Sequence, residues 1–416
     1  MKLKSLLSLL ILGISFSVLG QGRDLVRLIY ADSFTGSMLN GEAIREFIGS
    51  VHVERDGINL YCDRMIEFVN RRVIEATGHV KIVQNADILT SDFARYFPDS
   101  KFIYVERNVK LNSEGNLLTS DFGNFNFGTN LAGFWSRVKL FDSQSNEIRA
   151  DSLDYNRNLG HSKMFRNIRI FSPKDNTIIR GRYAENFNIQ QTAFVEQDAF
   201  LYQLPAKAGD DTLMIQSLRL DSDRRDSVNQ YMATGKVRMI QGEMSAISDT
   251  MIFFKNTGVI KLREKPIVWY DVNQVVGDSI DIITENNQFR QMDCFSNAFS
   301  VSLKDESTKK YNQLRGKTIR YFFQNRQINQ VSVEQTAESL YYLDQDGKPS
   351  GANFITGDNI LINFLNNEVD HIRVLSGVEG KFYPERMMIA EPILLKNFKW
   401  VGKERPTPAE LRVYVR

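Results

Sequence analysis

The feature that most constrains the fold of this chain is a short motif that recurs along almost its whole length. Each copy has a small residue, usually followed by Asp, and then alternating apolar residues. Successive copies lie about thirty residues apart, a period typical of folds that stack one supersecondary unit. The eleven copies begin at Ala31-Asp32, Cys62-Asp63, Ser91-Asp92, Ser120-Asp121, Ala150-Asp151, Gly181-Arg182, Ile215-Gln216, Ser248-Asp249, Gly277-Asp278, Gly316-Lys317 and Gly357-Asp358.

A second marker follows the first in the repeat and consists of two apolar residues that flank a polar one. In four consecutive copies it begins 17 residues after the Asp of the first marker. Its apolar residues include Val80, Ile82, Val109, Leu111, Val138, Leu140, Ile168, Ile170, Val237 and Met239. The polar residue between them is Lys81, Lys110, Lys139 and Arg169 in four consecutive copies.

Both markers lie in segments that alternate apolar and polar residues, which is the pattern of β-strands. Turn-forming clusters such as Ser113-Glu114-Gly115 separate these segments. One such unit cannot bury both of its faces, so the units are expected to stack and to share one apolar interior. The sequence therefore predicts an all-β fold of about eleven stacked units, and the periodicity leaves parallel and antiparallel winding open. Residues 41–47 are also compatible with a short helix.

The expected organisation has three parts. Residues 1–20 have the pattern of a signal peptide, with Lys2 and Lys4 before an apolar run over residues 6–16. Residues 21–383 carry the repeat, as one body or as two consecutive halves. Residues 384–416 contain four of the nine prolines and are expected to form a tail that leaves the stack.

Charge and cysteine content exclude several classes of protein. Without Lys2 and Lys4 the chain has 50 basic and 50 acidic residues, so a strongly basic nucleic-acid binder is not expected. Cys62 and Cys294 lie about seven stacked units apart, far beyond the reach of a disulfide, which favours two free, buried thiols. After the leader, no stretch is long and apolar enough to be expected to cross a bilayer as a helix.

The sequence offers no recognisable catalytic or metal-binding motif. The four histidines fall in different repeat units, and neither a phosphate-binding loop nor a nucleophile elbow is present. The recurring Asp could suggest the acidic clusters of β-helical polysaccharide-cleaving enzymes. Its fixed place in the unit instead favours a structural role at a corner of the backbone. We therefore expect no enzyme activity and no cofactor. Two functions remain open: binding along an apolar interior, or a purely structural role for a solenoid whose interior is packed core.

The repeat itself resembles that of the organic-solvent-tolerance (OstA-like) family of periplasmic lipopolysaccharide-transport proteins, which includes bridge proteins. The resemblance covers roughly residues 25–383. It rests on Ala76-Thr77-Gly78-His79-Val80-Lys81-Ile82 followed by Thr90-Ser91-Asp92, on Ala233-Thr234-Gly235-Lys236-Val237-Arg238-Met239 followed by Ser248-Asp249, and on Ser376-Gly377-Val378-Glu379-Gly380. It implies an elongated antiparallel β-jelly roll with lipid A acyl chains in its interior and with sugars and phosphates outside. The chain departs from the family in being longer than short bridge proteins and in lacking the strands of a C-terminal membrane barrel.

The resemblance implies functional roles for the residues of the second marker. The ten apolar residues of the second marker named above are expected to bind lipid, and Lys81, Lys110, Lys139 and Arg169 to face its phosphates. If adjacent rungs are in register, these cations would form a ladder at strand spacing. Expected partners are lipopolysaccharide and other jelly-roll components of the envelope transport machinery, joined by edge-strand pairing at residues 32–53 and 358–382. The expected location is the periplasm, with association at the outer membrane. A non-transport envelope β-solenoid, adhesive or structural, is the alternative, and a β-helical glycan lyase or hydrolase is the third reading.

Overall fold

The structure is a computed structural model that describes residues 26–412, except 56, 114, 175, 206–210, 286–287, 306, 346–347, 366–367 and 388–392. The chain divides into two compact units, residues 3–199 and residues 200–416, here called the N-terminal and C-terminal units. The expected signal peptide, residues 1–20, lies outside the described residues.

Strands make up almost all of the described secondary structure. The N-terminal unit contains β1 (Arg27–Tyr30), β2 (Ser33–Leu39), β3 (Glu42–Arg55), β4 (Ile58–Phe68), β5 (Val73–Gln84), β6 (Asp87–Phe97), β7 (Phe102–Ser113), β8 (Asn116–Asn126), β9 (Leu131–Phe141), β10 (Glu147–Asn156), β11 (His161–Ser172) and β12 (Thr177–Phe187). From β13 the chain continues with β13 (Thr192–Gln203), β14 (Leu213–Asp223), β15 (Gln230–Gln241), β16 (Met244–Phe254), β17 (Val259–Arg263), β18 (Ile267–Tyr270), β19 (Asn273–Val276), β20 (Ser279–Glu285), β21 (Gln288–Asp305), β22 (Lys310–Gln324), β23 (Gln327–Gln345), β24 (Lys348–Leu365), β25 (Glu368–Leu375) and β26 (Glu379–Pro384). Three short helical turns follow, at Glu385–Met387, Gly402–Glu404 and Pro408–Arg412 (α1).

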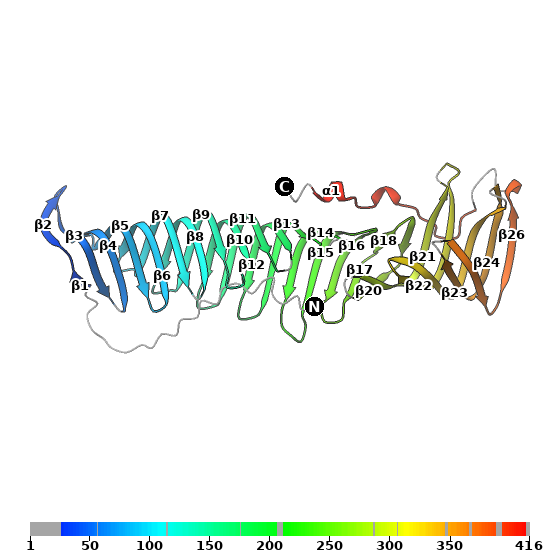
Figure 1. The fold of residues 1–416 in the computed structure, drawn as a ribbon, viewed down its shortest axis with the longest axis horizontal. Coiled ribbons are helices and arrows are strands. Elements are labelled where there is room, and N and C mark those ends of the chain that lie inside the picture. Colours follow the sequence, from blue (N-terminus) through cyan, green and yellow to red (C-terminus); the bar gives the residue numbers. More distant parts are fainter. Residues whose placement is uncertain are drawn as a thin grey trace. The chain divides into compact units, whose positions relative to one another are not determined.

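The fold is all-β and antiparallel, as the family resemblance implies. In the N-terminal unit each strand from β3 to β11 pairs with the strand before it and the strand after it along the chain, as Figure 1 shows. Every described pairing is antiparallel, and two strands make one repeat of the sequence. Residues 42–47 belong to β3, so the short helix considered for residues 41–47 is wrong. That segment pairs with β2 on one side and with β4 on the other.

Each repeat has one corner, where two consecutive residues adopt left-handed backbone angles. The eleven corners are Gly49-Ser50, Gly78-His79, Arg107-Asn108, Ser136-Arg137, Arg166-Asn167, Gln197-Asp198, Gly235-Lys236, Glu264-Lys265, Ser296-Asn297, Gln335-Thr336 and Ser376-Gly377. The strand register shifts there, for example between Thr77 and Val80 in the pairing of β5 with β4 and β6. Such bulges bend a strand, so every repeat turns at the same place and the sheet folds over on itself as a β-jelly roll.

The recurring Asp of the first marker sits on the neighbouring strand and secures the corner. Asn108 donates a hydrogen bond of 2.8 Å to Asp92, Asn167 one of 2.9 Å to Asp151, and Asn297 one of 3.1 Å to Asp278. The structural role expected for this Asp is therefore confirmed.

One of the eleven predicted markers is shifted by two residues. A Cβ atom added at Gly235 would meet the Leu218 side chain, so Leu218 lies opposite the Gly235 corner. The marker of this repeat is therefore Ser217-Leu218 and not Ile215-Gln216. The Ser217 hydroxyl also donates to the carbonyl of Arg219, two residues on, as Ser91 and Ser120 do to Phe93 and Phe122. Leu218 replaces the usual Asp at this marker, which explains the misplacement.

Both cysteines are free and buried, as expected. Burial raises the pKa of each thiol to about 12, because the charged thiolate loses its hydration in the apolar interior. The two thiols therefore act as small apolar side chains.

The last residues of the chain fold back along the outer face of the C-terminal unit. Gln313 accepts a hydrogen bond from the Leu395 amide (2.8 Å) and donates one to the Ile393 carbonyl (3.1 Å). Gln274 does the same with the Val401 amide (2.8 Å) and the Lys399 carbonyl (2.7 Å). Figure 1 shows this segment in red beside the strands of that unit. The expectation that the tail leaves the stack is thus wrong for residues 393–411. The physical reason is that this outer face carries apolar side chains, such as Phe299 and Val301, which Leu395 covers.

Candidate functional site

An apolar cavity lies inside the N-terminal unit, between two arms of the folded sheet. Because the strands alternate in direction, their connecting turns fall at two rims. The first rim holds the turns after β5, β7 and β9, and the second rim holds the turns after β6, β8 and β10. The corner lies between the rims, so each strand has a first arm that runs to the first rim and a second arm that runs to the second.

Side chains from both arms line this cavity. The first arm contributes Ile82, Leu89, Leu111, Leu118 and Leu140, and the second contributes Ile103, Val105, Phe125, Ala132, Phe134, Leu153 and Tyr155. The space that water-sized atoms can reach is about 90 Å³. A second cavity of about 140 Å³ shares Ile82, Gln84, Ile103 and Phe127 with the first and extends to Val53 and Leu60. Apolar space therefore continues along the interior through several repeats.

The structure places the ten predicted lipid-binding residues on the inner face, but only three of them line the first cavity. Those three are Ile82, Leu111 and Leu140, and Leu111 is only half-buried. Val80, Val109, Val138, Ile168 and Ile170 are at most 2% exposed. Val237 and Met239 belong to the packed core of the C-terminal unit. These seven residues therefore form the wall of the interior.

Sequence reasoning missed the residues of the second arm as a site. They alternate after the recurring Asp, as Leu153 and Tyr155 do after Asp151, so their period does predict an inward orientation. What the sequence could not give is that the two arms face each other, because this depends on how far each corner bends the sheet.

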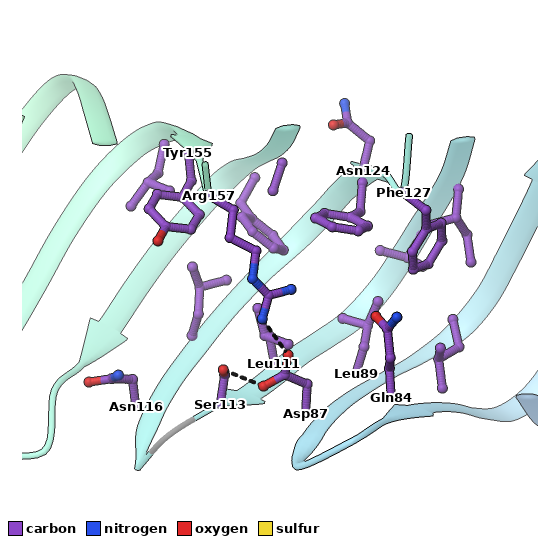
Figure 2. Close-up of a pocket in the computed structure, with 18 of the residues that line it drawn as sticks. Gln84, Asp87, Leu89, Leu111, Ser113, Asn116, Asn124, Phe127, Tyr155 and Arg157 are labelled. Carbon is purple, nitrogen blue, oxygen red and sulfur yellow. Dashed lines mark hydrogen bonds and ion pairs between the residues drawn. The ribbon is translucent and has the colours of Figure 1, made fainter. Parts of the chain in front are cut away.

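Polar side chains also reach the interior, near the mouth of the first cavity. Figure 2 shows Arg157, on the second rim, extending to Asp87 at the first rim, where Ser113 also donates a hydrogen bond to the carboxylate. No spacing in the sequence predicts this contact, because 70 residues separate Asp87 from Arg157.

The four predicted phosphate-facing cations lie on the outer face, but not at strand spacing. Thr90 lies between Lys81 and Lys110, and Thr119 lies between Lys110 and Lys139. Neighbouring lysines are thus two strands apart, roughly 9.6 Å, which is about one Debye length in physiological salt. The predicted ladder of directly opposed charges is therefore wrong for Lys81, Lys110 and Lys139, because each repeat contributes two strands and a threonine lies between these lysines. Beyond Lys139 cations do oppose each other directly, because Arg149 pairs with both Lys139 and Arg169, and Arg169 pairs with Arg180.

The four cations differ in exposure and in ion pairing. Lys81, Lys110 and Lys139 are exposed, and no carboxylate of the described residues lies within ion-pairing distance of any of them. Arg169 is less exposed, at 29% of its side chain, and lies 3.8 Å from Glu147. The three lysines are therefore freer than Arg169 to meet an external anion.

Within residues 26–412, outside the gaps given above, no group of His, Cys, Asp and Glu side chains could hold a metal ion. None of the described helices is long and apolar enough to cross a membrane.

Comparisons with known proteins give the following likenesses. A comparison with curated proteins found no match. Among solved structures, one match is the crystal structure of LptH, the LptA-homologous periplasmic component of the lipopolysaccharide transport device from Pseudomonas aeruginosa. It is 15% identical, with a TM-score of 0.27, and the match covers 34% of this chain and 95% of LptH. Residues 23–179 match the model of the OstA-like protein family, which confirms over that part of the chain the resemblance that the repeat predicts.

Proposed function

We propose that this chain is a periplasmic lipopolysaccharide-transport protein that carries lipid A acyl chains inside its β-jelly roll toward the outer membrane. The observation that carries the proposal is the apolar cavity between the two arms, which lies within the segment that matches the OstA-like family. An acyl chain exposed to water costs ~0.8 kcal/mol for each CH₂ group. A carrier needs continuous apolar surface and no catalytic group.

Location and leader belong to the same proposal. A signal peptide at residues 1–20 would export the chain to the periplasm, where a lipid in transit between two membranes needs a carrier. The ten predicted lipid-binding residues would then form the wall that the acyl chains pass, with Ile82, Leu111 and Leu140 in direct contact.

Photocrosslinking tests the proposed path. A diazirine amino acid close to leucine in volume, placed at Leu140, should give a lipopolysaccharide adduct in living cells. The control position is Lys139, the preceding residue, which is exposed on the outer face. We expect about tenfold more acyl-chain adduct at position 140, the ratio that burial of two CH₂ groups would give. Equal or absent adducts in a folded protein would leave the purely structural solenoid as the better reading.

The outer cations have a proposed role of their own. Lys81, Lys110 and Lys139, with Arg169 beyond them, would attract the lipopolysaccharide phosphates while the acyl chains lie inside. Lysine suits a moving anion because its ammonium is a point charge on a flexible stem.

Replacing Lys81, Lys110 and Lys139 together by Gln should weaken lipopolysaccharide binding about tenfold at low salt, if each exposed charge contributes ~0.5 kcal/mol. The loss should shrink at high salt, because mobile ions screen the same charges. Binding isotherms at several salt concentrations measure both effects. The control changes Lys348, Lys381 and Lys403, which are exposed in the C-terminal unit, and alters the net charge equally. If both triple variants bind alike, the row of lysines is not a phosphate contact.

Partner docking is proposed at the terminal strands. Within the described residues, β1 and β2 pair only with β3, and β25 and β26 pair only with β24. Each pair therefore offers an open edge to which another jelly roll could add a strand. At the first end the open strands are β1 (residues 27–30) and β2 (residues 33–39). Only β2 falls within the range 32–53 that the sequence predicts as the docking edge. The rest of that range lies in β3, which pairs on both sides.

A further inference from the structure

The ion pair of Asp87 and Arg157 joins the two rims of the N-terminal unit. Asp87 is the first residue of β6, next to the first rim, and Arg157 follows the last residue of β10, at the second rim. A straight strand of eleven residues would hold its two ends roughly 35 Å apart. The Arg157 Nη2 atom nevertheless lies 2.8 Å from the Asp87 Oδ2 atom. This pair therefore spans the mouth between the arms, and we call it the clasp.

The clasp is buried, although both of its groups carry charge. The Arg157 side chain is 9% exposed and the Asp87 side chain is 14% exposed. Ser113 gives Asp87 a further hydrogen bond. The positive charge of Arg157 is thus balanced by the Asp87 carboxylate, which accepts hydrogen bonds from both Arg157 and Ser113.

One donor of the clasp remains unused. The Arg157 Nε atom is buried and has no hydrogen-bond partner among the described residues. A buried donor without an acceptor is unfavourable, and a ligand that brings an acceptor relieves this cost. Arg157 also lines the apolar cavity, together with Leu153 and Tyr155 of the same arm. Figure 2 shows its side chain extending from beside Tyr155 toward Asp87 and Ser113.

The charge balance determines which acceptor fits. A second anion beside Asp87 would face a like charge in a poorly hydrated place, and this costs more than it gains. A neutral oxygen meets no such repulsion. Most of the remaining cavity wall is apolar and suits hydrocarbon, with Gln84, Asn116 and Asn124 as its other polar side chains.

We propose that the clasp binds a neutral hydrogen-bond acceptor on the cargo, namely the ester or amide carbonyl or the hydroxyl group near the head of an acyl chain. This inference rests on the proposed function and names the residue that would select among cargoes. A site that offers a buried donor discriminates against an analogue without the acceptor, because the donor then stays unpaired. Arg157 would therefore distinguish an acyl ester from plain hydrocarbon of equal length.

The test uses the full chain and defined ligands. Methyl laurate, an alkane of equal length and the laurate anion each compete with the fluorescent apolar probe N-phenyl-1-naphthylamine. We expect the ester to bind about tenfold more tightly than the alkane, as a hydrogen bond from a charged donor would give. The double variant Arg157→Met with Asp87→Leu removes both charges together and should bind ester and alkane equally. Circular dichroism and thermal unfolding show whether it is folded.

A second variant keeps the proposal testable if the double variant does not fold. Asp87→Asn preserves the shape and the acceptor of Asp87 but removes the balancing charge. We expect it to bind laurate more tightly than methyl laurate, which reverses the preference of the unmodified chain. An unmodified chain that binds ester and alkane equally would overturn the proposal, as would one that prefers laurate. If no ligand displaces the probe, the proposed function fails as well. If all ligands bind without discrimination, only the role of the clasp fails.

Discussion

Changing Leu111 to Asp should abolish acyl-chain binding while leaving the sheet folded. Leu111 lines the first cavity but is only half-buried, so its replacement costs less stability than a change at fully buried Leu140. The new carboxylate would lie where an alkyl chain packs, and burying it against hydrocarbon without a partner costs several kcal/mol. A loss of about 3 kcal/mol lowers the affinity more than a hundredfold. Displacement of an apolar fluorescent probe measures this loss directly.

Leu117 offers the matched control for this change. It lies on the neighbouring strand β8, is 39% exposed and does not line the cavity. Leu117→Asp introduces the same charge one strand away and should leave acyl-chain binding unchanged within about twofold, since surface substitutions rarely cost more than ~0.5 kcal/mol. If both variants lose binding equally, the interior is not the route. If Leu111→Asp retains binding in a folded protein, the acyl chain lies elsewhere.

Much of the fold follows from local chemistry that the sequence displays. The period of two predicts strands, and the recurring Asp marks the corner because Asn108 or Asn167 needs an acceptor there. The sequence pattern misplaces a marker only where Leu218 replaces the Asp opposite the Gly235 corner. In that repeat the apolar pattern remained but the polar marker was gone. The sequence therefore predicts the position of a corner correctly when the first marker has a polar residue opposite that corner.

The candidate site depended on longer-range geometry. Ile82, Leu111 and Leu140 could be predicted because they alternate beside the second marker. The opposing residues Phe134 and Leu153 required knowledge of how the sheet bends at its corners. The clasp lay beyond sequence reasoning altogether, because its two residues come from repeats that meet only when the rims approach. The spacing of the lysines failed for a related reason, since the repeat did not show how many strands it contributes.

The open edge strand β2 exposes large apolar side chains. Phe34 is 59% exposed and Met38 is 67% exposed, although both are apolar and lie on an outermost strand. Natural sheets commonly protect such edges with charged side chains, especially lysine. An unprotected apolar edge therefore fits a strand that pairs with another chain.

Replacing Phe34 and Met38 together by Lys should weaken end-to-end association by more than tenfold. Burial of either side chain in an interface contributes ~1.5 kcal/mol or more, and two ammonium groups oppose pairing of the edge. The chain itself serves as the partner, because its last strands offer the complementary edge, and sedimentation velocity over a range of concentrations gives the association constant. Leu159→Lys with Ile189→Lys is the control, since these residues are 56% and 70% exposed on turns of the same unit and away from the edge. Association that survives in the edge variant, or that fails equally in the control, would show that β2 is not a docking strand. Loss confined to the edge variant would place the contact between successive jelly rolls at β2, where the apolar interior of one could continue into the next.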